Sequence, residues 1–216
     1  MAWDTAGTQQ RLLEAGVRQF AAHGFAGARM DAIGRDAGVN KERVYQYFGN
    51  KRGLFAAVID DRLTNLLTAA GVPGPGSAGV GEFAGALFDH LAADPTLARL
   101  LAWESLEFED EAEEGGTGAP FEPLLSPAEL CRAETCEAQI GAVCGALPDL
   151  DPERATHLLL SIVALCASWW TLSRVGTMIA PGMTTAARRA ALVAQVTALA
   201  NEAAGSAQDT SVAPPA

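Results

Sequence analysis

A short stretch near the start of the chain, NKERVYQYFGNK at residues 40–51, combines cations with aromatic side chains. Lysine and arginine can donate to guanine edges or to phosphates, and tyrosine can contact a thymine methyl group. Residues 1–55 carry a net charge of +3, whereas the whole 216-residue chain carries −11, which leaves −14 for the remainder. A basic segment on an acidic chain indicates a region that meets a polyanion.

The pattern of apolar residues predicts that helices position this stretch. Apolar positions recur at helical spacing, alternating strand patterns are almost absent, and Ala and Leu are abundant, so we expect an all-α fold. The first helices are expected over 8–23, 29–37, 41–48 and 51–68. Gly38 suits a left-handed turn, and Asn40 suits the start of the helix that follows it. Residues 29–48 therefore have the form of a helix-turn-helix.

One side of the helix over 41–48 is expected to pack inward. Val44 and Phe48 share a face, which should rest on Ile33 and Phe20. The outward positions then hold three residues that can contact DNA, namely Lys41, Arg43 and Gln46. Such a helix can enter a major groove by its N-terminal end. Lys51, at the start of the next helix, could hold a phosphate together with the helix N-terminus.

The rest of the chain also favours helices. A Gly- and Pro-rich link is expected over 71–81 and a loop over 115–127, with helices over 82–93, 96–113, 128–147, 152–178 and 184–204. The polar tail at 206–216 is expected to be disordered. The apolar stretch 158–172 is short and contains hydroxyl residues, so it indicates a buried helix and no membrane partner. No leader pattern opens the chain, so we expect a cytoplasmic protein.

Patterns typical of catalysis are missing from the sequence. It has no nucleophile elbow, phosphate loop or dinucleotide glycine motif. The four cysteines form no C-x-x-C pair, and only three histidines are present. We therefore expect no catalytic residue, no metal site and no cofactor, and the protein is not expected to be an enzyme. Reduced thiols are the simplest interpretation of Cys131, Cys136, Cys144 and Cys166. A redox-sensing role stays open for the first three, which lie on one expected helix.

The N-terminal segments LLEAGVRQFAAHGF and MDAIGRDAGVNKERVYQYFGNKRGLFAAVI resemble the DNA-binding domain of TetR-family transcriptional repressors. The resemblance covers about residues 9–60 and includes G-V-N-K, Y-Q-Y-F and N-K-x-x-L in the family's order. It implies a three-helix DNA-binding domain at 1–50, followed by a larger helical ligand-binding and dimerisation domain at 51–205, with 51–68 as the connecting helix.

The resemblance also implies roles for individual residues. Lys41, Glu42, Arg43 and Tyr45 hold positions that face bases, Tyr47 and Lys51 hold positions that meet phosphates, and Arg29 and Asn40 sit where phosphate or base-edge contacts are common. Three residues depart from the family pattern. Ala28 replaces a capping threonine, Gly34 stands where alanine is usual, and Glu42 stands where a small residue is usual, so no operator sequence can be borrowed from relatives.

The function that the resemblance implies is a ligand-responsive repressor. It would bind a palindromic operator on double-stranded DNA as a homodimer, paired through its last two helices, and a small-molecule effector would release it. Candidate effector contacts are Trp103, Glu104, Phe108, Trp169, Trp170 and Arg174, with His90 and His157 as further polar groups. For any single aromatic residue, a place in the core is the simpler interpretation. An activator, or a helical adaptor that does not bind DNA, is the alternative.

Overall fold

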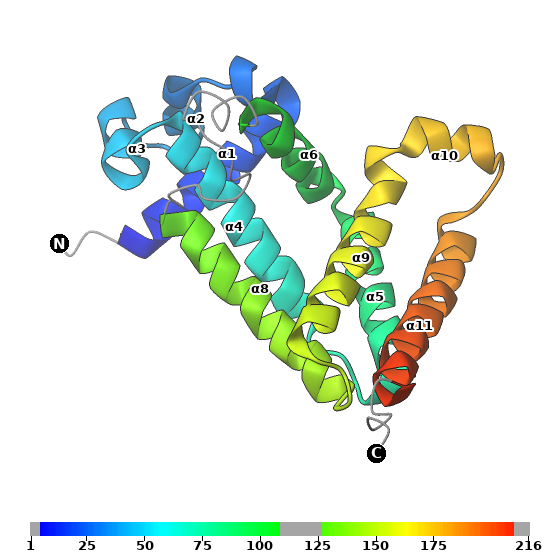
Figure 1. The fold of residues 1–216 in the computed structure, drawn as a ribbon. Coiled ribbons are helices and arrows are strands. Elements are labelled where there is room, and N and C mark those ends of the chain that lie inside the picture. Colours follow the sequence, from blue (N-terminus) through cyan, green and yellow to red (C-terminus); the bar gives the residue numbers. More distant parts are fainter. Residues whose placement is uncertain (1–4, 109–126, 210–216) are drawn as a thin grey trace, which may run out of the picture. The chain divides into compact units, whose positions relative to one another are not determined.

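The computed structural model describes residues 5–108 and 127–209, with side chains at 6–104 and 133–205, and these residues form helices and no strand (Figure 1). The predicted all-α fold is confirmed. The helices are α1 (Thr5–Gly27), α2 (Met30–Asp36), α3 (Lys41–Phe48), α4 (Lys51–Ala70), α5 (Gly76–Ala93), α6 (Thr96–Phe108), α8 (Pro127–Ala146), α9 (Pro152–Thr171), α10 (Ser173–Ile179) and α11 (Thr185–Asp209).

The chain divides into two compact units. The first joins the residues up to Thr64 with residues 96–133, and the second joins residues 65–95 with residues from Glu134 onward. Helix α4 belongs to the first unit up to Thr64 and to the second from Asn65. The functional division expected from the sequence, at residue 50, stays a prediction.

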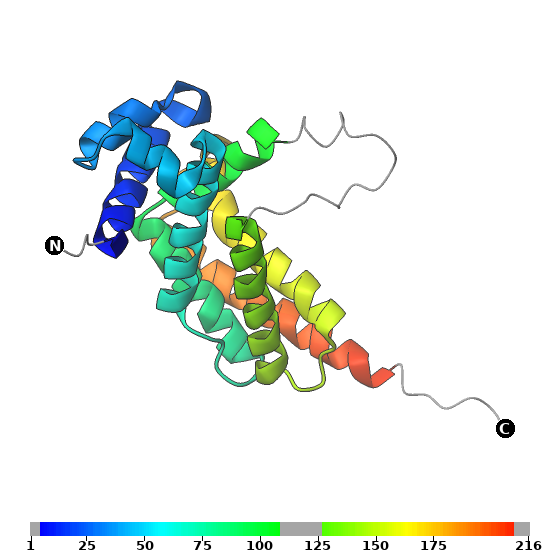
Figure 2. The ribbon, with the colours of Figure 1, turned by 90° about the vertical axis from the view of Figure 1, so that its left-hand side faces the viewer.

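An aromatic cluster lies at the centre of the first unit, where α1 packs on α2 and on α6 and α2 packs on α3. The rings of Phe20 and Phe55 meet edge to face with centroids 4.8 Å apart, and Phe25 lies 5.2 Å from Phe55. Ile33 and Val44 are fully buried. Helices α1 to α3, in blue, gather together in both views (Figures 1 and 2). This core fixes α3 on α2 and leaves the other side of α3 to solvent.

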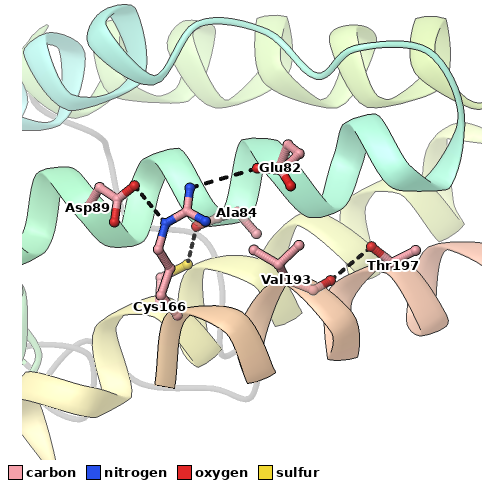
Figure 3. Close-up of polar contacts among 7 residues, drawn as sticks. Glu82, Ala84, Asp89, Cys166, Val193 and Thr197 are labelled. Atoms are coloured by element: carbon pink, nitrogen blue, oxygen red, sulfur yellow. Dashed lines mark hydrogen bonds and ion pairs between the residues drawn. The ribbon is translucent and has the colours of Figure 1, made fainter. Parts of the chain in front are cut away.

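Helices α5, α9 and α11 pack on one another in the second unit. The contact of α5 with α11 is close because glycines face α11. A Cβ atom on Gly85 would lie 2.8 Å from Arg189 Nη2 and 2.9 Å from Val193 Cγ2, and one on Gly81 would collide with the Thr197 hydroxyl. Figure 3 shows Val193 and Thr197 on the helix that runs beside α5. Leucine-sized side chains at these glycines would push the two helices apart.

Polar groups at the same contact are paired. The Arg189 guanidinium donates to Asp89 over 2.7 Å and lies 3.7 Å from Glu82 (Figure 3). The hydrogen bond that Arg189 donates to Asp89 is the main cause that raises the pKa of Arg189. On the α9 side, the Cys166 thiol donates to the Ala84 carbonyl over 3.4 Å. Burial raises the pKa of the Cys166 thiol to about 12. Cys166 is therefore a protonated, buried thiol, in line with the simplest interpretation of the cysteines.

Two predicted boundaries are wrong because packing outweighs local preference. The link expected over 71–81 ends early, since α5 begins at Gly76. Glycines at 79 and 81 lower helix propensity, but the buried contact of Gly81 with α11 stabilises helix there. At the other end of the chain, α11 continues to Asp209, so residues 206–209 are helical where disorder was expected. Residues 210–216 lie outside the described residues.

The single helix expected over 152–178 is also wrong, because the chain bends by 86° between α9 and α10. Leu172 leaves the helical conformation at φ −106° and ψ 27°. Just before it, the Ser168 hydroxyl donates to the Leu165 carbonyl over 2.9 Å and the Thr171 hydroxyl donates to the Ala167 carbonyl over 3.2 Å. Hydroxyl groups that bond back to the preceding turn bend helices.

Within the described residues, no single helix has both the length and the apolar character needed to cross a membrane, and α9 with α10 satisfies those criteria only as a bent pair.

Candidate nucleic-acid interface and effector residues

The turn between α2 and α3 is built as the sequence predicted. Gly38 adopts φ +72°, and the Val39 amide donates to the Gly34 carbonyl over 2.8 Å. The Asn40 side chain accepts a hydrogen bond from the Arg43 amide over 3.0 Å and so caps α3. A Cβ on Gly34 would lie 3.2 Å from Val44 Cγ2. A residue without a side chain at position 34 thus lets α3 sit close on α2.

The outer side of α3 is polar and exposed. Lys41, Glu42, Tyr45 and Gln46 are exposed, whereas Arg43 and Tyr47 are half-buried. The Lys41 ammonium lies 5.7 Å from the centre of the Tyr45 ring. Lys41, Glu42 and Arg43 lie at the N-terminal end of α3, which is the end that enters a major groove in helix-turn-helix proteins.

Some cationic side chains of the first unit are paired with a carboxylate and others are not. Arg18 lies 2.9 Å from Asp36, and Arg35 lies 3.5 Å from Asp31. Lys41 and Arg29, by contrast, have no carboxylate partner among the residues described. Both are exposed, so these two cations are available to an outside anion.

Lys51 has a contact inside the protein that the sequence did not predict. Its ammonium donates to the Ala26 carbonyl over 3.1 Å and lies 4.8 Å from the centre of the Phe25 ring. Beside it, the Asn50 side chain caps α4 by accepting from the Gly53 amide over 2.8 Å. In the free protein Lys51 therefore ties the start of α4 to the end of α1. Its phosphate contact stays a prediction.

The effector candidates on α6 lie against α1. A Cβ on Gly24 would lie 3.9 Å from the Trp103 ring, and the Arg99 guanidinium lies 5.5 Å from the centre of that ring. Arg99 also donates to the Ala21 carbonyl over 3.5 Å. Trp103 thus packs at the kink where Gly24 interrupts α1 with φ +70°. Glu104 follows it and is half-buried, while the side chain of Phe108 lies outside the described residues.

The candidates on α9 and α10 lie around a pocket of about 350 Å³. Both Trp169 and Trp170 line it, and the ring of Trp170 also contacts Phe88 on α5 with centroids 4.8 Å apart. Arg174 is exposed on α10 next to the pocket residue Ser173. The remaining lining residues, which sequence reasoning missed, are Gly176, Thr177, Ala180, Gly182 and Met183. The hydroxyl residues before Leu172 were the signal for the bend that creates this pocket.

The other predicted polar groups do not join this pocket. His90 and His157 are exposed and are absent from its lining. Among the described residues, no three His, Cys, Asp or Glu side chains are grouped so that they could hold a metal ion. The effector candidates are thus divided between the two units, with Trp103 and Glu104 in the first and Trp169, Trp170 and Arg174 in the second.

Known proteins resemble this chain in both parts. Residues 12–58 match the family described as bacterial regulatory proteins, tetR family, and residues 79–120 match a tetracyclin repressor-like C-terminal domain. The HTH-type transcriptional repressor SCO4008 of Streptomyces coelicolor is 36% identical over 166 residues, which cover 77% of this chain and 79% of that protein.

Solved structures show the same fold. The putative transcriptional regulator SCO4942 from Streptomyces coelicolor is 32% identical, with a TM-score of 0.60 over 89% of this chain and 97% of its own. A tetR-family transcriptional regulator from Streptomyces coelicolor reaches a TM-score of 0.64 at 16% identity, over 95% of this chain and 85% of its own. With the capped helix-turn-helix already described, these similarities show that the chain belongs to the TetR family of helix-turn-helix transcriptional regulators.

Proposed function

We propose that this chain is a ligand-responsive repressor that binds a palindromic operator as a homodimer and leaves it when a small molecule binds. Regulators of this family bind DNA and are dimeric. The observation that carries the proposal is the outer side of α3, where Lys41 is exposed without a carboxylate partner in the described residues. DNA is the polyanion that a cytoplasmic regulator of this family meets.

The roles of the DNA-contacting residues follow from their chemistry. Lys41 and Arg43 would donate to guanine edges, Glu42 would accept from a cytosine amino group, and Tyr45 would touch a thymine methyl. Gln46 lies on the same exposed side and could reach an adenine edge or the backbone. The phosphate contacts would come from residues at the helix starts and from the half-buried tyrosine, namely Arg29, Asn40, Tyr47 and Lys51.

The dimer would form through α9 and α11. Leu160 is 65% exposed on α9, and Val163 on α9 and Leu199 on α11 are also exposed. Apolar groups in a patch on the surface indicate a protein partner. In a two-fold dimer the same patch pairs with itself, which places two copies of α3 in the two half-sites of a palindrome.

Release from DNA would act through α4. This helix runs without a break from the unit that holds α3 into the unit that holds the pocket of about 350 Å³. An effector that favours one arrangement of α4 would change the separation of the two recognition helices. Ligand and operator would then weaken each other by the same factor.

The first experiment is fluorescence anisotropy with DNA from upstream of the protein's own coding region, at several salt concentrations. We expect Lys41→Ala/Lys51→Ala to bind more weakly than the wild type, with a shallower dependence on salt. Arg35→Ala is the matched control, since it removes an exposed cation from the same unit that is already paired with Asp31. The control should bind as the wild type does.

Failure to bind that DNA would lead to a selection from random sequences. If this selection also returned no preferred site, the repressor proposal would be wrong and a helical adaptor would be the better description. An adaptor should keep its activity when Lys41 and Lys51 are replaced. Binding without repression in a reporter assay would instead indicate an activator.

A further inference from the structure

The pocket at the bend between α9 and α10 has walls of a particular kind. Its aromatic surface comes from Trp169 and Trp170. The Phe88 ring packs against the Trp170 ring, with the two ring centroids 4.8 Å apart. Gly176 lies close to the Trp169 ring, since a Cβ there would lie 3.9 Å from it, which is ordinary van der Waals contact. A cavity of about 350 Å³ is in the range of small-ligand sites. Flat indole rings suit a flat, apolar ligand body.

Polar groups in the lining are few and uncharged. They come from Ser173 and Thr177, one helical turn apart on α10. The Thr177 hydroxyl already donates to the Ser173 carbonyl over 2.9 Å, so towards the pocket it can only accept a hydrogen bond. The Ser173 hydroxyl has no hydrogen bond to another described residue, so it can donate to a ligand oxygen.

The chain segment that forms this pocket carries charge of one sign. The chain has 26 Asp and Glu residues, yet none lies between residues 154 and 201, where four arginines occur. Three of these arginines are occupied in the described structure. Arg154 bonds to the Ala203 carbonyl, Arg188 to the Leu165 carbonyl, and Arg189 to Asp89.

Arg174 is the arginine of this segment with no partner among the described residues. It is exposed, and it lies on α10 directly after Ser173 and three residues before Thr177, both of which line the pocket. A guanidinium in that position can bind a carboxylate through charge-assisted hydrogen bonds. An ammonium group would find no carboxylate in the pocket lining to pair with.

We propose that this pocket is the effector site and that it takes a small amphipathic carboxylate, with a flat apolar body against the Trp169 and Trp170 rings and its carboxylate at Arg174 and Ser173. Only the role of the pocket as an effector site rests on the proposed function. Binding of a carboxylate to the pocket can be measured without DNA. This proposal also separates the candidate residues on α9 and α10 from Trp103 and Glu104, which belong to the other unit.

The test is isothermal titration calorimetry of the full chain with three probes that share one ring system, namely 2-naphthoate, 2-naphthol and 2-naphthylmethylammonium. We expect 2-naphthoate to bind most tightly and the ammonium probe to bind most weakly. Arg174→Gln should weaken 2-naphthoate by about tenfold and leave 2-naphthol unchanged, because it removes a charge-assisted hydrogen bond. Arg154→Gln is the matched control, since Arg154 is bonded elsewhere.

A second variant tests the position of the site. Gly176→Leu should fill the pocket and abolish binding of 2-naphthoate and 2-naphthol, whereas Gly141→Leu, on an exposed helical glycine with open space around it, should not. Thermal unfolding checks that both variants fold. The proposal is overturned if 2-naphthoate does not bind, if the neutral or cationic probe binds as tightly, or if Gly176→Leu binds as the wild type does.

The role as effector site is read separately by operator anisotropy. If 2-naphthoate binds at Arg174 and also weakens operator binding, both parts of the proposal are supported. If it binds there and operator affinity does not change, the effector role is overturned while the carboxylate site stands. If no operator is found at all, the proposed function fails, and calorimetry still decides the site.

Discussion

The outer sides of α3 and of α9 with α10 are both exposed, but only α9 and α10 expose several large apolar side chains. On α3 the exposed side chains are Lys41, Glu42, Tyr45 and Gln46. On α9 and α10 they include Leu160 at 65% exposure and Met178 and Ile179 at 79% each. A polar face can stay hydrated until DNA binds, whereas exposed large apolar side chains favour a partner that covers them. The two faces therefore indicate two different partners.

The supports beneath these faces also differ. Helix α3 is positioned by short-range features, namely Gly38 at φ +72° and the Asn40 cap. Helix α9 is positioned by α5, which in turn lies on α11 through Gly85, about a hundred residues away along the chain from Arg189. Local signals set the first face, and long-range packing sets the second.

The largest effect should come from a charge on the apolar face. Leu160→Asp would place a carboxylate in the proposed dimer contact, where it must lose its hydration. We expect a monomer in light scattering and operator affinity lower by about 100-fold or more, since two half-sites are no longer held together. The control is Val72→Asp, because Val72 is 70% exposed but lies outside α9 to α11. An intact dimer in Leu160→Asp would contradict the proposed interface.

The next effect concerns the support beneath the apolar face. Gly85→Leu should push α5 away from α11, because even a Cβ there would lie 2.8 Å from Arg189 Nη2. Overpacking of this kind lowers the free energy of unfolding by about 1–3 kcal/mol, which chemical denaturation can measure. Gly145→Leu, with open space around its backbone, should change it far less. Equal losses in the two variants would mean that the close contact of α5 and α11 is unimportant for stability.

A smaller effect should follow from removing the acid on the DNA-facing side. Glu42→Ala leaves Lys41 and Tyr45 in place and takes away a carboxylate with no partner among the described residues. We expect discrimination at one cytosine of the operator to relax by about tenfold, which is about 1.4 kcal/mol, while binding to unrelated DNA becomes slightly tighter. A selection from random sequences measures both. Unchanged base preference would remove Glu42 from the base-reading residues.

The smallest effect is the pH dependence of stability that Cys166 contributes. Burial raises the pKa of its thiol from 9.0 to about 12. The neutral thiol therefore stabilises the folded state below about pH 9, and that stabilisation is lost as the pH rises through the two values. Between pH 8 and 10, the free energy of unfolding of Cys166→Ala should fall by about 1 kcal/mol less than that of the wild type. An unchanged slope would show that the α5–α9 contact admits water.

The DNA-binding part could be predicted from the sequence because its signals are local. The glycine at the turn, the asparagine caps and the spacing of Val44 and Phe48 are each within a few residues of what they determine. Even here one contact was missed, since the position of Lys51 over the Phe25 ring joins α4 to α1. No pattern in the neighbouring residues marks such a contact.

The arrangement of the second unit could not be predicted from the sequence, because it depends on contacts between distant helices. The sequence by itself determined the helical class, the turn and the charges of α3, because backbone preferences and side-chain chemistry act over a few residues. Only the tertiary structure decided that α5 begins at Gly76, that the chain bends at Leu172, and that Trp169 and Trp170 line one pocket. These features arise where helices far apart in sequence touch, and the free energy of burying Gly81 against α11 outweighs the low helix propensity of glycine.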